Sequence, residues 1–245
     1  MKKKFLLLLT VLLTFVTITS ANSQKERNHT VMKESESVII GGETKSLTAF
    51  TQIYSPHIYL NKKYQSPDLL YLNYEVVDKA NFYIIRFHIE WEDEIVPNKL
   101  LDQVYRVIRR IVYGPSNSDI EFLQIDVDKK SAEIIRVLFE TKEEAKSYNS
   151  NHQEHLIIDI RKDKDTFEKS LKEKGKNGNV LNQQNLGFKL KRKIHLESIT
   201  WNHLLGIIEK PDSNLQLLEY KTRYLDDTAY VEKRYAKRSQ GDYEI

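Results

Sequence analysis

Alternating apolar and polar positions mark two pairs of β-strands in the chain. Residues 69–91 are rich in β-branched and aromatic side chains on both sides of a four-residue turn at 78–81, which is the pattern of a β-hairpin. Residues 120–141 repeat this pattern about a turn at 128–131. Over 76–94, eight of nineteen residues are identical to those 50 positions later. Two hairpins of equal length have therefore either converged on similar residues or arisen by duplication.

The apolar positions of residues 98–113 recur with a different period from those of the hairpins. Apolar side chains recur there at every third or fourth position, and most charged side chains fall on the other side, which predicts an amphipathic helix. Asp226-Asp227 are suited to cap a C-terminal helix that runs to Arg238. The charged stretch 162–185, with several Gly and Asn, predicts a flexible loop. Together these elements predict an α+β fold, in which an antiparallel sheet of hairpins carries the helix 98–113 on one face and is closed by the C-terminal helix.

The first 21 residues have the pattern of a secretory signal peptide. Three lysines precede a fourteen-residue, largely apolar run over 5–18, and small residues follow up to Ala21. As a helix this run would rise about 21 Å, which is short of a hydrocarbon core of about 30 Å. A cleaved signal at 1–21 is therefore favoured over a membrane anchor. The polar residues 22–37 predict a disordered leader, and 38–245 a single exported domain.

Composition narrows the classes of function. The 245-residue chain holds 38 Lys and Arg against 35 Asp and Glu, and the predicted signal contains three of the lysines and no acid. The mature chain would then carry no net charge, which argues against nucleic-acid binding. The absence of Cys excludes a disulfide framework, a Cys nucleophile and a lipoprotein anchor, and together with a signal peptide it suits a secreted or periplasmic bacterial protein. No phosphate-binding Gly loop or dinucleotide motif is present, so no cofactor is expected.

The strongest candidate for chemistry is the segment 88–94, with the sequence His-Ile-Glu-Trp-Glu-Asp-Glu. Because side chains alternate between the two faces of a strand, its four polar members at alternate positions share one face, and Trp91 anchors the other. These four are His88, Glu90, Glu92 and Glu94. Neighbouring carboxylates repel one another, which raises the pKa of at least one of them when they are buried, as a general acid requires.

A second acidic pair, Asp119 and Glu121, opens the strand that follows the helix. If this strand pairs with the first hairpin, the carboxylates converge in an arrangement used for acid–base catalysis or for calcium. The alternative is a solvated strand face with no chemical role. The candidate catalytic residues are Glu92, Glu90, Glu121 and Asp119, the candidate ligand-binding residues are His88, Glu94 and Trp91, and no complete set of metal ligands is evident.

The helix 98–113 also carries three arginines, Arg106, Arg109 and Arg110. Only a few residues from Ile95 onward separate the acidic strand end from the helix, so we expect this basic stripe to contact the acidic segments 90–94 or 119–121. A buried Arg–carboxylate contact would keep the carboxylate ionised and favour a structural role over a role as an acid.

These features favour an exported, non-catalytic binding or structural protein of the cell envelope. No catalytic motif is complete, and the chain is rich in tyrosine, with 14 residues of this type, which suits contacts with proteins or sugars. The expected partner is an envelope or extracellular component or a glycan, and the mature form is expected to have no transmembrane helix. The alternative is a hydrolase that uses the carboxylates of 88–94 and 119–121 on a carbohydrate or another polymer.

The signal peptide makes a direct prediction about the mature N-terminus. Cleavage after the apolar run leaves a chain that begins near Asn22 or Gln24. Edman sequencing or intact-mass measurement of the exported protein checks this start. A soluble mature protein that retained residues 5–18 would contradict it.

Overall fold

The computed structural model describes residues 31–63, 69–92, 96, 98–113, 119–141, 156–173, 180–200 and 202–225. Within these residues the chain forms fourteen strands and two helices. Their bounds are β1 (Ser37–Ile40), β2 (Glu43–Ser46), α2 (Leu47–Tyr54), β3 (His57–Asn61), β4 (Leu69–Asp78), β5 (Phe82–Trp91), α3 (Lys99–Tyr113), β6 (Asp119–Asp128), β7 (Ile134–Thr141), β8 (Leu156–Asp163), β9 (Thr166–Glu173), β10 (Val180–Asn185), β11 (His195–Ser198), β12 (Leu205–Ile208), β13 (Leu215–Leu217) and β14 (Lys221–Tyr224). The fold is therefore mostly β, and the prediction of an α+β fold is wrong.

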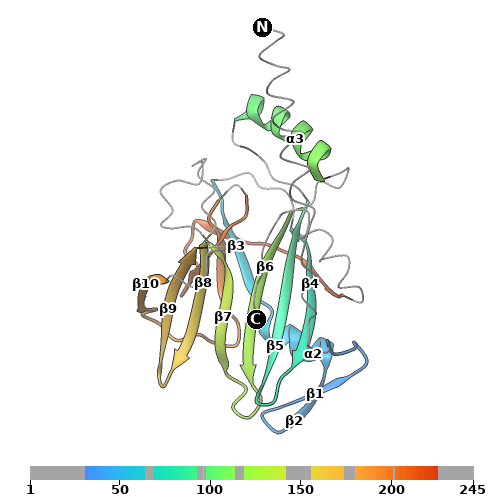
Figure 1. Ribbon diagram of the computed structural model, residues 1–245, viewed down its shortest axis with the longest axis vertical. Helices are drawn as coiled ribbons and strands as arrows, with labels where there is room; N and C mark the ends of the chain where they lie inside the picture. The colour runs from blue at the N-terminus through green and yellow to red at the C-terminus, as the bar shows by residue number, and fades with distance from the viewer. Residues whose placement is uncertain are drawn as a thin grey trace.

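An eight-stranded sheet, the main sheet, forms the front layer of the molecule (Figure 1). Its order is β10-β9-β8-β7-β6-β5-β4-β14, so the strands from β4 to β10 form a continuous meander in which each strand pairs with the next. The two hairpins expected from the sequence are β4–β5 and β6–β7. All neighbours in the sheet are antiparallel except β14, which returns from the end of the described chain and pairs parallel with β4.

A smaller layer covers one face of the main sheet. It contains a four-stranded sheet of order β12-β11-β3-β13, together with α2 and the β1–β2 hairpin. In Figure 1, β3 passes behind the main sheet. The side chain of Ser46 caps α2 by accepting a hydrogen bond from the backbone N–H of Ala49. Leu47, Phe50 and Tyr54 of α2 then turn one face of the helix into the core.

The core lies between these two layers and is built by alternation along the strands. On β5, the core-facing residues Tyr83, Ile85, Phe87, Ile89 and Trp91 are all buried and belong to one apolar cluster with residues of β3, β11 and α2. Full burial of each large apolar side chain contributes about 1.5–3 kcal/mol. The two layers are therefore held together by one continuous apolar core. Its side chains on the main sheet come from alternate positions of the strands.

The helix expected at 98–113 is present as α3, but it does not cover a face of the sheet. It lies beyond the ends of the strands (Figure 1), and Leu100, Leu101, Val104 and Val107 of its apolar side are exposed. The apolar face of the sheet, where an amphipathic helix would pack, is already occupied by α2 and the smaller sheet. The C-terminal helix expected at 226–238 lies outside the described residues.

The segment 162–185 contains β9 and β10 in place of the expected loop. Cross-strand pairing with β8 outweighs the charged composition of this segment, because Phe167 is buried and Leu171 packs against the core. At the other end of the chain, part of the expected leader touches the sandwich. Val31 bridges to Val77, and Met32 is buried. No helix in the described part of the chain is both long and apolar enough to cross a membrane.

Candidate functional site

Glu90 lies on the face of the main sheet that points away from the apolar core. It is buried, and its Oε2 accepts hydrogen bonds from Asn73 Nδ2 (3.0 Å) and Arg223 Nη2 (3.2 Å). The parallel pairing of β14 with β4 sets Arg223 opposite Asn73. The guanidinium of Arg223 also lies 4.3 Å from the ring centre of Tyr71. Glu90 is thus part of an ion pair that ties β14 to β4 and β5.

His88 lies on the same face of β5, two residues before Glu90. It is buried, and its Nε2 is 4.0 Å from Oε1 of Glu75, which also accepts a hydrogen bond from Arg86 Nη1 (2.9 Å). Glu92 follows the end of β5 at a bend, and its side chain is exposed. Glu94 lies outside the described residues.

Asp119 and Glu121 point to the opposite face of the sheet, into the sandwich. The register of β5 and β6 sets Asp119 opposite Trp91, and Glu121 opposite Ile89, and residues directly opposite each other share a face. Both carboxylates are buried. Glu90 therefore lies across the sheet from Asp119 and Glu121, and the expected convergence of these carboxylates does not occur.

A buried histidine outside the predicted site residues, His203, contacts Asp119. The Nδ1 of His203 lies 3.3 Å from Oδ2 of Asp119, and its ring stacks on Trp91 with centroids 4.1 Å apart and planes 8° apart. Its backbone has a φ of 61°, in a region that non-glycine residues enter only when their surroundings hold them there. Thr200 supplies that support, because its carbonyl accepts the N–H of His203 and its hydroxyl accepts the N–H of Leu204.

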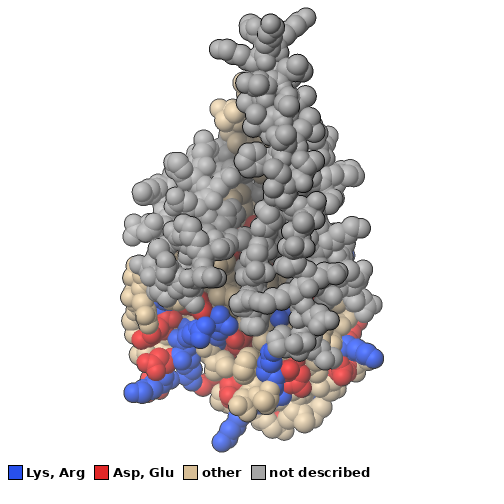
Figure 2. Space-filling view, in the orientation of Figure 1, with Lys and Arg blue, Asp and Glu red and all other residues tan. Residues whose placement is uncertain are grey.

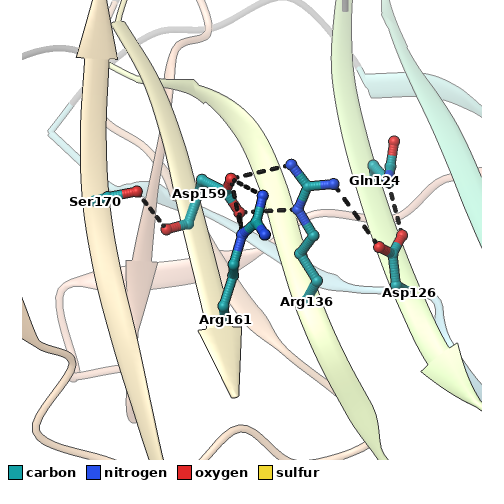
Figure 3. Close-up of polar contacts among 6 residues, drawn as sticks. All are labelled: Gln124, Asp126, Arg136, Asp159, Arg161 and Ser170. Carbon is teal, nitrogen blue, oxygen red and sulfur yellow. Dashed lines mark hydrogen bonds and ion pairs between the residues drawn. The ribbon is translucent and has the colours of Figure 1, made fainter. Parts of the chain in front are cut away.

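The outward face also carries a network of charged side chains across β6, β7 and β8 (Figure 3). Asp159 is its centre. Arg136 donates to Asp159 from Nε (2.9 Å) and Nη2 (3.0 Å), and Arg161 donates from Nη2 (3.0 Å). Asp126 accepts a hydrogen bond from Gln124 Nε2 (2.7 Å) and lies 3.9 Å from Arg136 Nη1.

The two carboxylates of this network have opposite pKa shifts. Burial raises the pKa of Asp126 to about 6, against the opposing effects of the Gln124 hydrogen bond and the Arg136 charge. Burial also acts to raise the pKa of Asp159, but the hydrogen bonds and charges of Arg136 and Arg161 outweigh it and lower the pKa to about 2. Asp159 is thus the stably ionised member, and Asp126 is the one that gains a proton near neutral pH.

Both hairpins place an arginine opposite a carboxylate on this face. Arg86 of β5 lies opposite Glu75 of β4, and Arg136 of β7 lies opposite Asp126 of β6. The two arginines are among the residues that repeat at the 50-residue offset. In the coloured part of Figure 2, side chains of both signs lie side by side over the lower half of the molecule. The repeat therefore provides charge pairing within the sheet.

Of the three arginines in the basic stripe, the side chain of Arg106 is described. Arg106 Nε donates to Asp102 Oδ2 (2.8 Å), one turn earlier on the same helix. The side chains of Arg109 and Arg110 lie outside the described part of the structure. A contact between the stripe and the acidic segments stays a prediction.

A pocket of about 370 Å³ opens between the end of the β6–β7 hairpin, the β8–β9 hairpin and the segment that leads to β11. We call it the cationic pocket. Its lining residues are Ser131, Ala132, Glu133, Ile134, Lys162, Asp165, Phe167, Lys189, Leu190, Lys191 and Arg192. Ala132, Ile134 and Phe167 are buried and form an apolar floor. The four cations in this set exceed the two acids by two charges.

Lys162 is the cation of the pocket that already has an acidic partner, because it forms an ion pair with Glu133. Lys189, Lys191 and Arg192 are exposed, and none of them forms an ion pair with another described residue. The sequence signal for this site is the alternation of Lys189 and Lys191 with Leu190, and these residues are not among the predicted site residues.

Among the described residues, no group of three or more His, Asp or Glu is placed to hold a metal ion. Comparisons of the chain with protein-family models, with curated proteins and with solved structures find no match.

The opposite pKa shifts of Asp126 and Asp159 predict opposite effects of matched substitutions. The pKa of Asp126 in the folded protein lies above its ordinary value of 3.8. Ionisation of this buried group therefore lowers the free energy of unfolding as the pH rises from about 4 through 6. The total decrease is about 3 kcal/mol at most. Asp126→Asn removes that cost. We expect the variant to be more stable than wild type at pH 8 and to lose this advantage at pH 4.

Asp159→Asn is the matched comparison in the same network. The depressed pKa of Asp159 contributes stability above about pH 4 that is lost as the pH falls through 2, and its removal leaves two guanidinium groups without their shared carboxylate. We expect a loss of about 3–5 kcal/mol at pH 8. Urea unfolding at both pH values measures both variants, and equal changes for the two would contradict the assignment.

Proposed function

We propose that the protein is an exported, non-catalytic binding domain of the cell envelope, and that its ligand site is the cationic pocket. The observation that carries this proposal is the combination of an apolar floor with three cations, Lys189, Lys191 and Arg192, that form no ion pair among the described residues. Export rests on the signal-like pattern of residues 1–21. A ligand pocket of a few hundred Å³ with few oriented polar groups is typical of small-molecule binding.

The lining of the pocket favours an organic anion with an apolar body. Phe167 and Ile134 offer apolar surface at the base, where contact with a ring or an alkyl chain is favourable. Lys189 and Lys191 at the rim offer positive charge to a carboxylate, sulfate or phosphate group. A neutral ligand would gain nothing from the charge of these lysines, and an inorganic anion would gain nothing from the apolar floor.

The positions of the carboxylates favour binding over acid–base catalysis. Glu90 is engaged by Asn73 and Arg223, and Asp119 lies beside His203. Retaining and inverting glycosidases both need two carboxyl groups within about 5–10 Å across one substrate cleft. Glu90 and Asp119 instead lie on opposite faces of the main sheet, so they are not placed to act as such a pair.

Binding to the cationic pocket is tested with the fluorescent arylsulfonate anilinonaphthalene sulfonate, which joins an anion to an apolar ring system. We expect binding that weakens as salt increases and that drops by at least about tenfold in the double variant Lys189→Gln/Lys191→Gln, because two attractive charges near the anion are lost. The matched control is Lys63→Gln/Lys210→Gln, which removes two exposed lysines outside the pocket. Equal affinity of the two double variants would refute the pocket as the site.

A hydrolase remains the second candidate, and one observation supports it. Of the four candidate catalytic residues, Glu92 is the exposed one, while Glu90, Asp119 and Glu121 are buried. If the protein turns over a polymer, Glu92→Gln should lower the rate by about 100-fold or more, the usual scale for a general acid or base. The measurement is a screen of wild type and variant against cell-wall and plant polysaccharides. Turnover that survives the substitution removes Glu92 from the mechanism, and turnover at any level refutes the non-catalytic proposal.

A further inference from the structure

Helix α3 exposes a continuous apolar stripe. Leu100, Leu101, Val104 and Val107 are between 50% and 72% exposed. They make up four of the six exposed large apolar side chains in the described part of the chain. Their spacing of one, three and three residues places them on one side of a helix, so the exposure is a single surface and not a scatter of separate residues.

The other side of α3 faces the sandwich. Tyr105 packs against the buried cluster of Leu60 and Val96, and Asp102 Oδ1 accepts a hydrogen bond from the backbone N–H of Val96 (3.0 Å). These contacts hold the helix through its polar side and leave the apolar stripe directed outward. This is the reverse of the usual orientation, in which the apolar stripe of a surface helix faces the core.

The charge of the helix indicates what covers this stripe. Between residues 99 and 113 the chain holds the four cations Lys99, Arg106, Arg109 and Arg110, and the single acid Asp102. An exposed apolar stripe on a helix with a basic excess is the pattern of helices that lie in the interface of an anionic membrane. With a length of about 22 Å, the helix is too short to span a hydrocarbon core of about 30 Å.

We propose that α3 binds an anionic lipid surface. The apolar stripe enters the boundary between headgroups and acyl chains, the helix lies parallel to the membrane, and the net positive charge of the helix attracts the anionic headgroups. The position of α3 beyond the ends of the strands (Figure 1) allows this contact without opening the sandwich. The inference is independent of the cationic pocket, which is lined by residues of other segments.

The test is co-sedimentation of the mature chain, residues 22–245, with vesicles of phosphatidylglycerol and phosphatidylcholine, and with vesicles of phosphatidylcholine alone. We expect binding to the anionic vesicles, weaker binding to the neutral ones, and a loss of at least about tenfold in Leu101→Ser/Val104→Ser. The matched control is Ile39→Ser/Leu217→Ser, which removes the two exposed large apolar residues outside α3 in the described part of the chain, at 61% and 49% exposure. This control should bind as wild type does.

Absence of binding to the anionic vesicles, or an equal loss in the control, overturns the proposal. Sedimentation velocity of the same proteins tests whether a second copy of the chain covers the apolar stripe instead. A dimer that Leu101→Ser/Val104→Ser dissociates and the control does not, without vesicle binding, assigns the stripe to a second copy of the chain and overturns the lipid proposal. Urea unfolding verifies that each variant is folded, and Leu100→Asn/Val107→Asn repeats the measurement with the other half of the stripe.

Discussion

The apolar face of the main sheet is covered by β3, β11 and α2, and most other features of the molecule follow from that contact. Because side chains alternate along each strand, burying one face on the small layer directs every second residue to the other face. On β4 to β8 those residues include Glu75, Arg86 and Asp159, which are buried as well. Buried charges are tolerated when they are paired, so the same alternation that builds the core requires an ionic network on its reverse side.

The local elements were accessible from the sequence, but the architecture was not. The β4–β5 and β6–β7 hairpins and α3 have strong periodic patterns, and they occur near the positions that the patterns predict. The fold class was wrong because it depended on how α3 packs. An amphipathic pattern shows that a helix has an apolar side but not what that side contacts. Strands β9 and β10 were missed because their charged composition resembles that of a loop, and only pairing with β8 explains why they form strands.

The face of the sheet on which each candidate site residue lies depends on the register between neighbouring strands. Alternation within one strand places His88 and Glu90 on a common face, as the sequence analysis expected, but it cannot relate one strand to the next. Asp119 lies opposite Trp91, and a shift of one residue would have brought it to the face of Glu90. Partners such as Arg223 for Glu90 and His203 for Asp119 come from segments 133 and 84 residues away in the chain, and no local pattern connects them.

The second layer also has a consequence for the order of folding. β3 at residues 57–61 pairs with β11 at 195–198, and β4 pairs with β14 at 221–224. Contacts between such distant parts of a chain form slowly, because a long loop must close before any of them is made. The meander from β4 to β10 has only neighbouring pairs, but the layer that covers its apolar face is incomplete until β11, in the last third of the chain, pairs with β3. A chain that reaches its compact state this late stays extended for longer after synthesis, and under the export proposed above an extended chain is the form that passes through a narrow secretion channel.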